Sequence, residues 1–150
     1  MPNTFSSLPT APRCAEHEGR PVTKVAILAG GLGSRLAEET AVKPKPMVEI
    51  GGKPIVWHIM AIYAHYGFHD SVIALGYKGE VIEKYMVECL TLSGNFTVDP
   101  GSGSMGHPQK SDCNWSAQLI DTGLRTMTGG RVKRLRPYLD NTTFMFTWGD

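Results

Sequence analysis

The sequence has no apolar stretch that approaches the roughly 20 residues needed to cross a bilayer, although 41% of its 150 residues are hydrophobic. It also lacks an excess of charge of either sign, because 15 Lys and Arg stand against 14 Asp and Glu. A sequence-wide basic surface for nucleic acid or anionic lipid is therefore not predicted. We expect no nucleic-acid partner and no membrane partner, and any anion must be recognised by a local group of residues.

Cysteine pairs are absent as well. Cys14, Cys89 and Cys113 are an odd number, widely spaced, and form no C-x-x-C motif, which argues against a disulfide framework and a structural zinc site. We expect reduced thiols and a cytoplasmic location. Residues 1–22 are rich in Pro, Ser and Thr and lack the long apolar segment of a signal peptide, so we expect a flexible tail before a domain at 23–150.

Short apolar runs and amphipathic segments alternate from Lys24 onward. Their patterns predict strands at 24–29, 71–75, 117–122 and 143–148, and helices at 54–66, 81–90 and 129–139, the last interrupted near Pro137. Residues 93–115 break this rhythm, and there we expect one short strand and an exposed loop. Alternating strands and helices predict an α/β fold in which helices cover both faces of a mainly parallel sheet. Ligands in such folds bind beyond the carboxyl ends of the strands.

A glycine-rich segment follows the first predicted strand. Gly30, Gly31 and Gly33 leave backbone N–H groups open to close approach by phosphate oxygens, and Arg35 adds a permanent cation. An ordinary strand-to-helix turn with a solvated arginine would show the same residues. The Walker A pattern fails because no lysine follows Gly33, and the dinucleotide fingerprint fails because Leu36 stands where its third glycine is needed. A nicotinamide enzyme is therefore a weak alternative.

The K-P-K-P segment at 43–46 sharpens the phosphate hypothesis. Its two prolines fix backbone φ angles and are expected to block a helix. A rigid extended arm of this kind could direct the ammonium of Lys45 toward the glycine segment, although two lysines among prolines are also compatible with a solvated loop. Farther along, Lys133, Arg134 and Arg136 are expected to form a solvated helix face.

Longer motifs add a family resemblance. LAGGLGSRL followed by KPKPMVEIGGKPI resembles the N-terminal signature of the nucleoside-diphosphate-sugar pyrophosphorylases. EETAVKPKPMVEIGGKPIVWHIM, GYKGEVIEKY, and DTG followed by MTGGRVKR most resemble the members that are cytidylyltransferases acting on glucose 1-phosphate. The resemblance extends from Lys24 to Asp150 and is weakest at 93–115. It implies a Rossmann-like, GT-A-like nucleotidyltransferase fold with a mixed, mainly parallel sheet.

The resemblance also implies roles for individual residues. Lys45 would contact the reacting phosphates and act in catalysis with Arg35, and Asp150 would be a ligand of Mg²⁺. Ser34 stands where the family more often has threonine, and its hydroxyl keeps the hydrogen-bond donor. The residues implied in nucleotide or substrate binding are Leu28, Ala29, Gly30, Gly31, Leu32, Gly33, Ser34, Arg35, Lys45, Thr126, Arg131 and Gly149.

The implied reaction joins CTP and α-D-glucose 1-phosphate to give CDP-glucose and pyrophosphate, in nucleotide-sugar and O-antigen biosynthesis. Family members continue beyond the T-W-G-D sequence with a sugar-binding half and a second acidic metal ligand, and the full-length enzymes are expected to be homo-oligomers. We therefore expect this chain to be a C-terminally truncated, N-terminal part that is inactive alone. A nucleotide-binding remnant without turnover, and an enzyme that uses UTP or dTTP, stay open as alternatives.

Overall fold

The computed structural model describes residues 23–31, 43–91, 97–106, 114–139 and 142–150. Its centre is a four-stranded, wholly parallel sheet in the order β7–β4–β1–β8. The strands are β1 (Val25–Leu28), β4 (Asp70–Leu75), β7 (Ser116–Asp121) and β8 (Met145–Trp148). All four residues of β1 are buried, as expected for an interior parallel strand. The predicted strands are confirmed to within two residues at each end, and the predicted tail at 1–22 lies outside the described residues.

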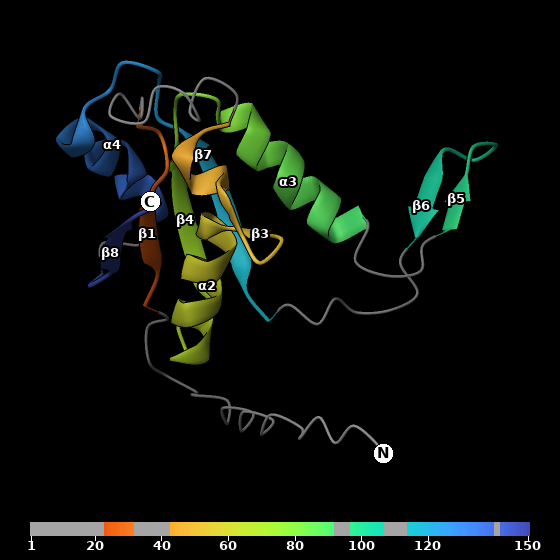
Figure 1. Cartoon of the computed structure of the whole chain (residues 1–150), viewed down its shortest axis with the longest axis horizontal. Helices are drawn as coiled ribbons and strands as arrows, with labels where there is room; N and C mark the ends of the chain where they lie inside the picture. Colours follow the sequence, from red (N-terminus) through yellow and green to blue (C-terminus); the bar gives the residue numbers. More distant parts are fainter. Residues whose placement is uncertain (1–22, 32–42, 92–96, 107–113, 140–141) are drawn as a thin grey trace.

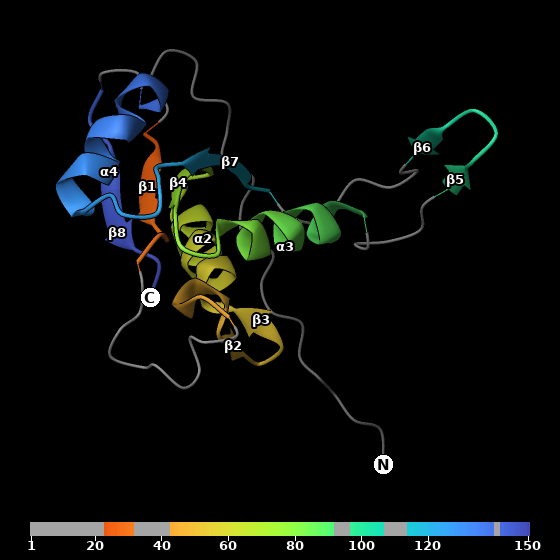
Figure 2. The same cartoon turned by 90° about the horizontal axis from the view of Figure 1, so that it is seen from above.

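Helices cover both faces of this sheet, as the sequence predicts. α2 (Ile55–His65) and α3 (Gly79–Thr91) lie on one face, and α4 (Thr128–Leu135) lies on the other (Figures 1 and 2). Alternate residues of β1 serve the two layers, because Val25 and Ile27 pack in the cluster with α2 and α3, whereas Ala26 and Leu28 pack with Leu135 of α4. A 3-10 turn, η2 (Arg136–Tyr138), follows α4 and contains Pro137.

The end of α2 follows directly from its sequence. Gly67 adopts a φ of +89°, a left-handed conformation that glycine reaches without a steric penalty. Its N–H donates to Ala64 O at 3.0 Å, and the N–H of Phe68 donates to Tyr63 O at 3.0 Å, which is the Schellman pattern. The rings of Tyr63 and Phe68 meet edge to face with centroids 6.3 Å apart, so the turn that ends the helix also returns the chain to the core.

The K-P-K-P segment differs from its prediction. Lys45–Met47 forms a single 3-10 turn, η1, instead of an extended arm. Pro44 is extended, with φ −68° and ψ 150°, whereas Pro46 occupies the first turn, where a helix needs no N–H from it. The antiparallel pair β2 (Glu49–Ile50) and β3 (Lys53–Pro54) follows, joined by two glycines with positive φ.

Residues 93–115 hold two strands where the sequence predicts one. β5 (Thr97–Asp99) and β6 (Ser104–Gly106) form an antiparallel hairpin that stands apart from the central sheet in both views (Figures 1 and 2). The intervening P-G-S-G sequence ends in Gly103, whose φ is +65°. The glycines and proline that predict a loop therefore form the turn of a hairpin.

None of the helices in the described part of the chain combines the length and the apolar character that a membrane span requires. Cys89 is a free thiol, and Cys14 and Cys113 lie outside the described residues. The apolar side chains of the helices pack in the two core clusters, one on each side of the sheet.

Replacing Ile27 by alanine should destabilise the protein strongly. Ile27 is fully buried at the centre of the sheet, and removing a large core side chain leaves a cavity that costs about 2 to 5 kcal/mol. The control is Ile62→Ala in α2, where the side chain is 59% exposed and the expected change is within about 0.5 kcal/mol. Urea unfolding followed by circular dichroism measures both, and equal midpoints would contradict the assigned core.

Candidate functional site

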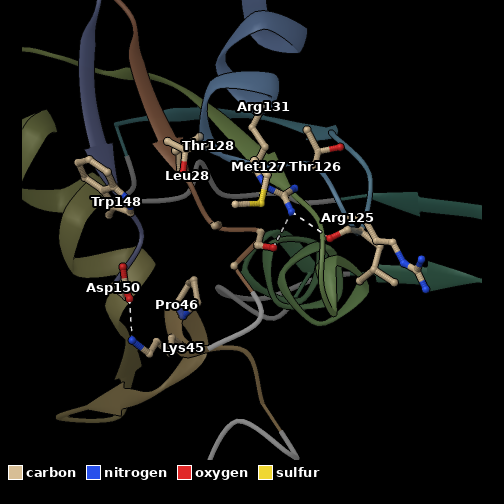
Figure 3. A pocket seen from close by; sticks show the side chains of 14 residues that line it. Leu28, Lys45, Pro46, Arg125, Thr126, Met127, Thr128, Arg131, Trp148 and Asp150 are labelled. Atoms are coloured by element: carbon tan, nitrogen blue, oxygen red, sulfur yellow. Dashed lines mark hydrogen bonds and ion pairs between the residues drawn. The ribbon is translucent and has the colours of Figure 1, made fainter. Parts of the chain in front are cut away.

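A cleft of about 470 Å³ lies at the carboxyl ends of β1 and β8 and beside the loop that joins β7 to α4 (Figure 3). This is the edge at which parallel α/β sheets bind ligands. The cleft is lined by Leu28, Ala29, Gly30, Gly31, Lys45, Pro46, Leu124, Arg125, Thr126, Met127, Thr128, Arg131, Trp148 and Asp150. Its walls therefore come from segments that are distant in the sequence.

The glycine segment continues β1 as an ordered backbone. Ala29 N–H donates to Ala74 O at 3.0 Å, and Gly30 O accepts from Tyr77 N–H at 3.3 Å. A Cβ atom at Gly30 would lie 2.6 Å from Cζ of Arg131, which is closer than real Cβ contacts allow. Gly30 is thus a glycine because an arginine lies against its backbone. Gly31 is the last residue of this segment that the structure describes.

Arg131 is the most heavily bonded side chain at the cleft. It is only 5% exposed, and its Nη1 donates to Leu75 O at 2.8 Å and to Thr122 Oγ1 at 2.6 Å. Its Nη2 donates to Gly30 O at 2.8 Å and to Leu124 O at 3.3 Å (Figure 3). The guanidinium thereby joins the chain beyond β1, β4 and β7. Its four terminal N–H bonds point at protein oxygens, so direct contact with a nucleotide stays a prediction from the resemblance.

The charge of Arg131 sits in an unfavourable environment. Burial lowers its pKa most, the positive charge of Arg134 lowers it further, and Asp121 acts in the opposite direction. Arginine stays protonated in proteins despite such shifts. The carbonyl and hydroxyl oxygens that accept its hydrogen bonds therefore stabilise the positive charge of Arg131. Because Arg131 lines the cleft, this charge favours the binding of an anionic ligand there.

Lys45 and Asp150 line the cleft on the side opposite Arg131 and the β7–α4 loop (Figure 3). The ammonium of Lys45 donates to Asp150 Oδ2 at 2.9 Å, and the two side chains are 27% and 38% exposed (Figure 3). η1 carries the lysine, and the aspartate follows β8 by two residues. The 3-10 turn thus achieves what the sequence assigned to an extended arm, because it brings Lys45 to the glycine end of β1.

Most predicted site residues that the structure describes gather here. Eight of them line the cleft, namely Leu28, Ala29, Gly30, Gly31, Lys45, Thr126, Arg131 and Asp150. Gly149 is not among the lining residues, and its N–H donates to Leu28 O at 2.9 Å. Leu32, Gly33, Ser34 and Arg35 lie outside the described residues, and their roles stay predictions.

Sequence reasoning missed several exposed apolar residues of the cleft. Met127 is 81% exposed, and Leu124 and Trp148 are each 54% exposed, which is unusual for large apolar side chains that also line a concavity. The available signal was their position, since Trp148 precedes the G-D pair and Leu124 and Met127 flank Thr126. Such side chains could contact the apolar faces of a base or a sugar.

Comparison with known proteins agrees with this geometry. Residues 25–105 match the family described as the MobA-like NTP transferase domain. The chain belongs to this family. The match begins with β1 and ends within β6, and nucleotidyltransferase membership does not favour the nicotinamide alternative.

Relatives of this NTP transferase chain include two cytidylyltransferases. The glucose-1-phosphate cytidylyltransferase of Salmonella typhimurium is 50% identical over 128 residues, which are 85% of this chain and 50% of that protein. A probable glucose-1-phosphate cytidylyltransferase of Bacillus subtilis is 40% identical over 130 residues, with the same two coverages. The chain thus spans about half the length of these curated relatives.

Solved structures support the same fold. HddC from Yersinia pseudotuberculosis, in a complex with GMP-PN, is 29% identical with a TM-score of 0.56, over 85% of this chain and 48% of that one. A UDP-glucose pyrophosphorylase complexed with UDP-glucose has a TM-score of 0.59 at 17% identity, over 86% of this chain and 46% of that one. The predicted nucleotidyltransferase α/β fold is confirmed.

The glycine at position 30 should be essential for the cleft of this NTP transferase domain. In Gly30→Ala the new Cβ would lie 2.9 Å from Gly76 N and even closer to the guanidinium of Arg131, so one of these groups must move. We expect the free energy of unfolding to fall by at least about 2 kcal/mol relative to the unaltered protein. Gly31→Ala is the control, because no described atom lies within 4 Å of a Cβ there. Thermal unfolding compares the two, and identical melting temperatures would contradict the proposed close contact.

Proposed function

We propose that the whole protein catalyses nucleotidyl transfer from CTP to α-D-glucose 1-phosphate, giving CDP-glucose and pyrophosphate. The observation that carries the proposal is the 50% identity to the Salmonella typhimurium glucose-1-phosphate cytidylyltransferase over 85% of this chain. The cleft supports it, since eight residues implied by the resemblance line one cavity at the carboxyl end of a parallel sheet. Such an activity belongs to nucleotide-sugar biosynthesis.

The proposed reaction requires stabilisation of negative charge on the phosphates more than it requires proton transfer. A sugar phosphate oxygen is already anionic at neutral pH, so it can attack the α-phosphorus of the nucleotide in line without a protein base, and the bond to pyrophosphate breaks. Lys45 reaches the cleft from η1 and would hold the reacting phosphates together. Backbone N–H groups of the glycine segment, together with Arg35, would stabilise the negative charge of the departing pyrophosphate.

Magnesium is the proposed cofactor, with Asp150 as its protein ligand. Among the residues that the structure describes, no group of three or more His, Cys, Asp or Glu side chains could hold a metal ion. Mg²⁺ is commonly bound by one or two carboxylates together with phosphate oxygens and water, so the single carboxylate of Asp150 at the cleft fits a metal that binds with the nucleotide. When bound, the ion would supply positive charge to the phosphate oxygens.

The full-length protein is proposed to be a homo-oligomer, on the resemblance alone. A nucleotide-binding protein without turnover, and an enzyme selective for UTP or dTTP, are the other outcomes that the assays below distinguish.

In the whole protein, Lys45→Ala should reduce kcat/KM by roughly one hundred- to one thousandfold, because a cation that stabilises transition-state charge is lost. Lys43→Ala is the matched control, since Lys43 lies two residues away and pairs with Glu49 at 2.7 Å on the exposed surface. Pyrophosphate release from CTP and glucose 1-phosphate measures both variants. Equal losses in the two variants, or near-normal turnover by Lys45→Ala, would contradict the role given to Lys45.

CTP should be the preferred nucleotide. The expectation rests on the relatives, because the cytidylyltransferases match 85% of this chain whereas a mannose-1-phosphate guanyltransferase of Neurospora crassa matches 55% at 39% identity. Pyrophosphate release with CTP, UTP, dTTP and GTP against glucose 1-phosphate gives the order of kcat/KM. If another nucleotide equalled CTP, nucleotidyl transfer would survive and the cytidine assignment would fail.

A further inference from the structure

Arg134 is exposed, as the sequence predicts for Lys133, Arg134 and Arg136, but its guanidinium is also hydrogen bonded to the neighbouring loop. It lies one turn after Arg131 on α4, and its Nη1 donates to Thr122 O and, at 2.8 Å, to Thr126 Oγ1. Both acceptors belong to the loop between β7 and α4, and Thr126 lines the cleft. Arg134 and Arg131 therefore both donate hydrogen bonds to this loop, Arg134 to Thr122 O and Thr126 Oγ1, and Arg131 to Thr122 Oγ1 and Leu124 O.

Two glycines leave room for this arrangement. A Cβ at Gly123, whose φ is +82°, would lie 2.6 Å from Arg134 Nη1 and 3.0 Å from Thr126 Oγ1. A Cβ at Gly130 would lie 2.8 Å from Thr126 Cγ2. The half-buried side chain of Thr126 thus has its hydroxyl on Arg134 and its methyl against Gly130.

This threonine does not offer its hydroxyl to the cleft. Figure 3 shows the oxygen of Thr126 pointing away from Leu28 and Trp148 on the opposite wall, in keeping with its hydrogen bond to Arg134. The groups that the loop presents at the cleft are therefore set by how Thr126 is anchored.

We propose that Arg134 is a positioning residue for nucleotide binding. Through Thr126, and with the space left by Gly130, it fixes loop 123–127 at the rim of the cleft. The inference rests on the proposed function, because the loop is taken to meet the nucleotide. It predicts a specific kinetic signature: Lys45 and Asp150 stand on the other wall, so a displaced loop raises KM for CTP more than it changes kcat.

The two glycines that open α4 separate this role from a purely structural one. Both Gly129→Ala and Gly130→Ala place a better helix former in the same helix, so neither should lower the melting temperature through helix propensity. Only the second must displace Thr126, because no described atom lies within 4 Å of a Cβ at Gly129. We expect KM for CTP to rise about tenfold in Gly130→Ala, as for loss of a hydrogen bond to a charged group, and to stay unchanged in Gly129→Ala.

Substitutions of the arginine test the hydrogen bond itself. Arg134→Gln should raise KM for CTP about as much as Gly130→Ala, whereas Lys133→Gln removes the same charge from an exposed neighbour and should not. Arg134→Lys keeps a charged donor and should recover part of the affinity. Thr126→Val should add little to Arg134→Gln, because both remove one interaction.

Steady-state kinetics and calorimetric binding of CTP, measured on the same protein preparations, distinguish the possible failures. If the unaltered protein binds CTP and the two glycine variants share one KM and one dissociation constant, the positioning role is overturned and the proposed function stands. If the unaltered protein binds none of CTP, UTP, dTTP and GTP, the proposed function is overturned together with the inference. A fall in kcat at unchanged KM would also overturn the positioning role.

Discussion

The guanidinium of Arg131 holds together the backbone at three strand ends, and the cleft depends on this one group. It bonds Gly30 O after β1, Leu75 O at the end of β4, and the Thr122 hydroxyl after β7. The Thr122 hydroxyl in turn donates to Leu75 O at 2.5 Å. Burial of the cation is costly, and the hydrogen bonds to oriented oxygens offset that cost. The glycines at 30 and 76 are required because the guanidinium fills the space of their side chains.

The cleft has two walls of different chemical character. Lys45 and Asp150 form one wall from η1 and the end of β8, where they are paired as ions. The β7–α4 loop forms the other wall with exposed apolar side chains such as Leu124 and Met127. The two walls therefore belong to different elements of the fold.

Local sequence signals succeeded where a single segment decides its own structure. The buried run that became β1 and the Gly67 that ends α2 both act through their own backbone and neighbours. The same signals give a wrong prediction at two places. The prolines of K-P-K-P predict no helix around Lys45, yet Lys45–Met47 forms a 3-10 turn. Residues 93–115 are predicted to hold one strand, yet β5 and β6 pair there as a hairpin.

The α/β class, the helices on both faces and the glycine segment after the first strand can be predicted from the sequence, because they follow from periodicity and from backbone preferences within short segments. The sequence motifs also indicate Lys45, Thr126, Arg131 and Asp150 as site residues. The contacts of these side chains, in contrast, depend on the packing of the whole fold. Arg131 reaches Gly30, which is 101 positions away, and Lys45 reaches Asp150, which is 105 positions away. Arg134 is a loop anchor for the same reason, since a hydrogen bond between distant segments depends on how the sheet and helices pack, and no local pattern encodes that packing.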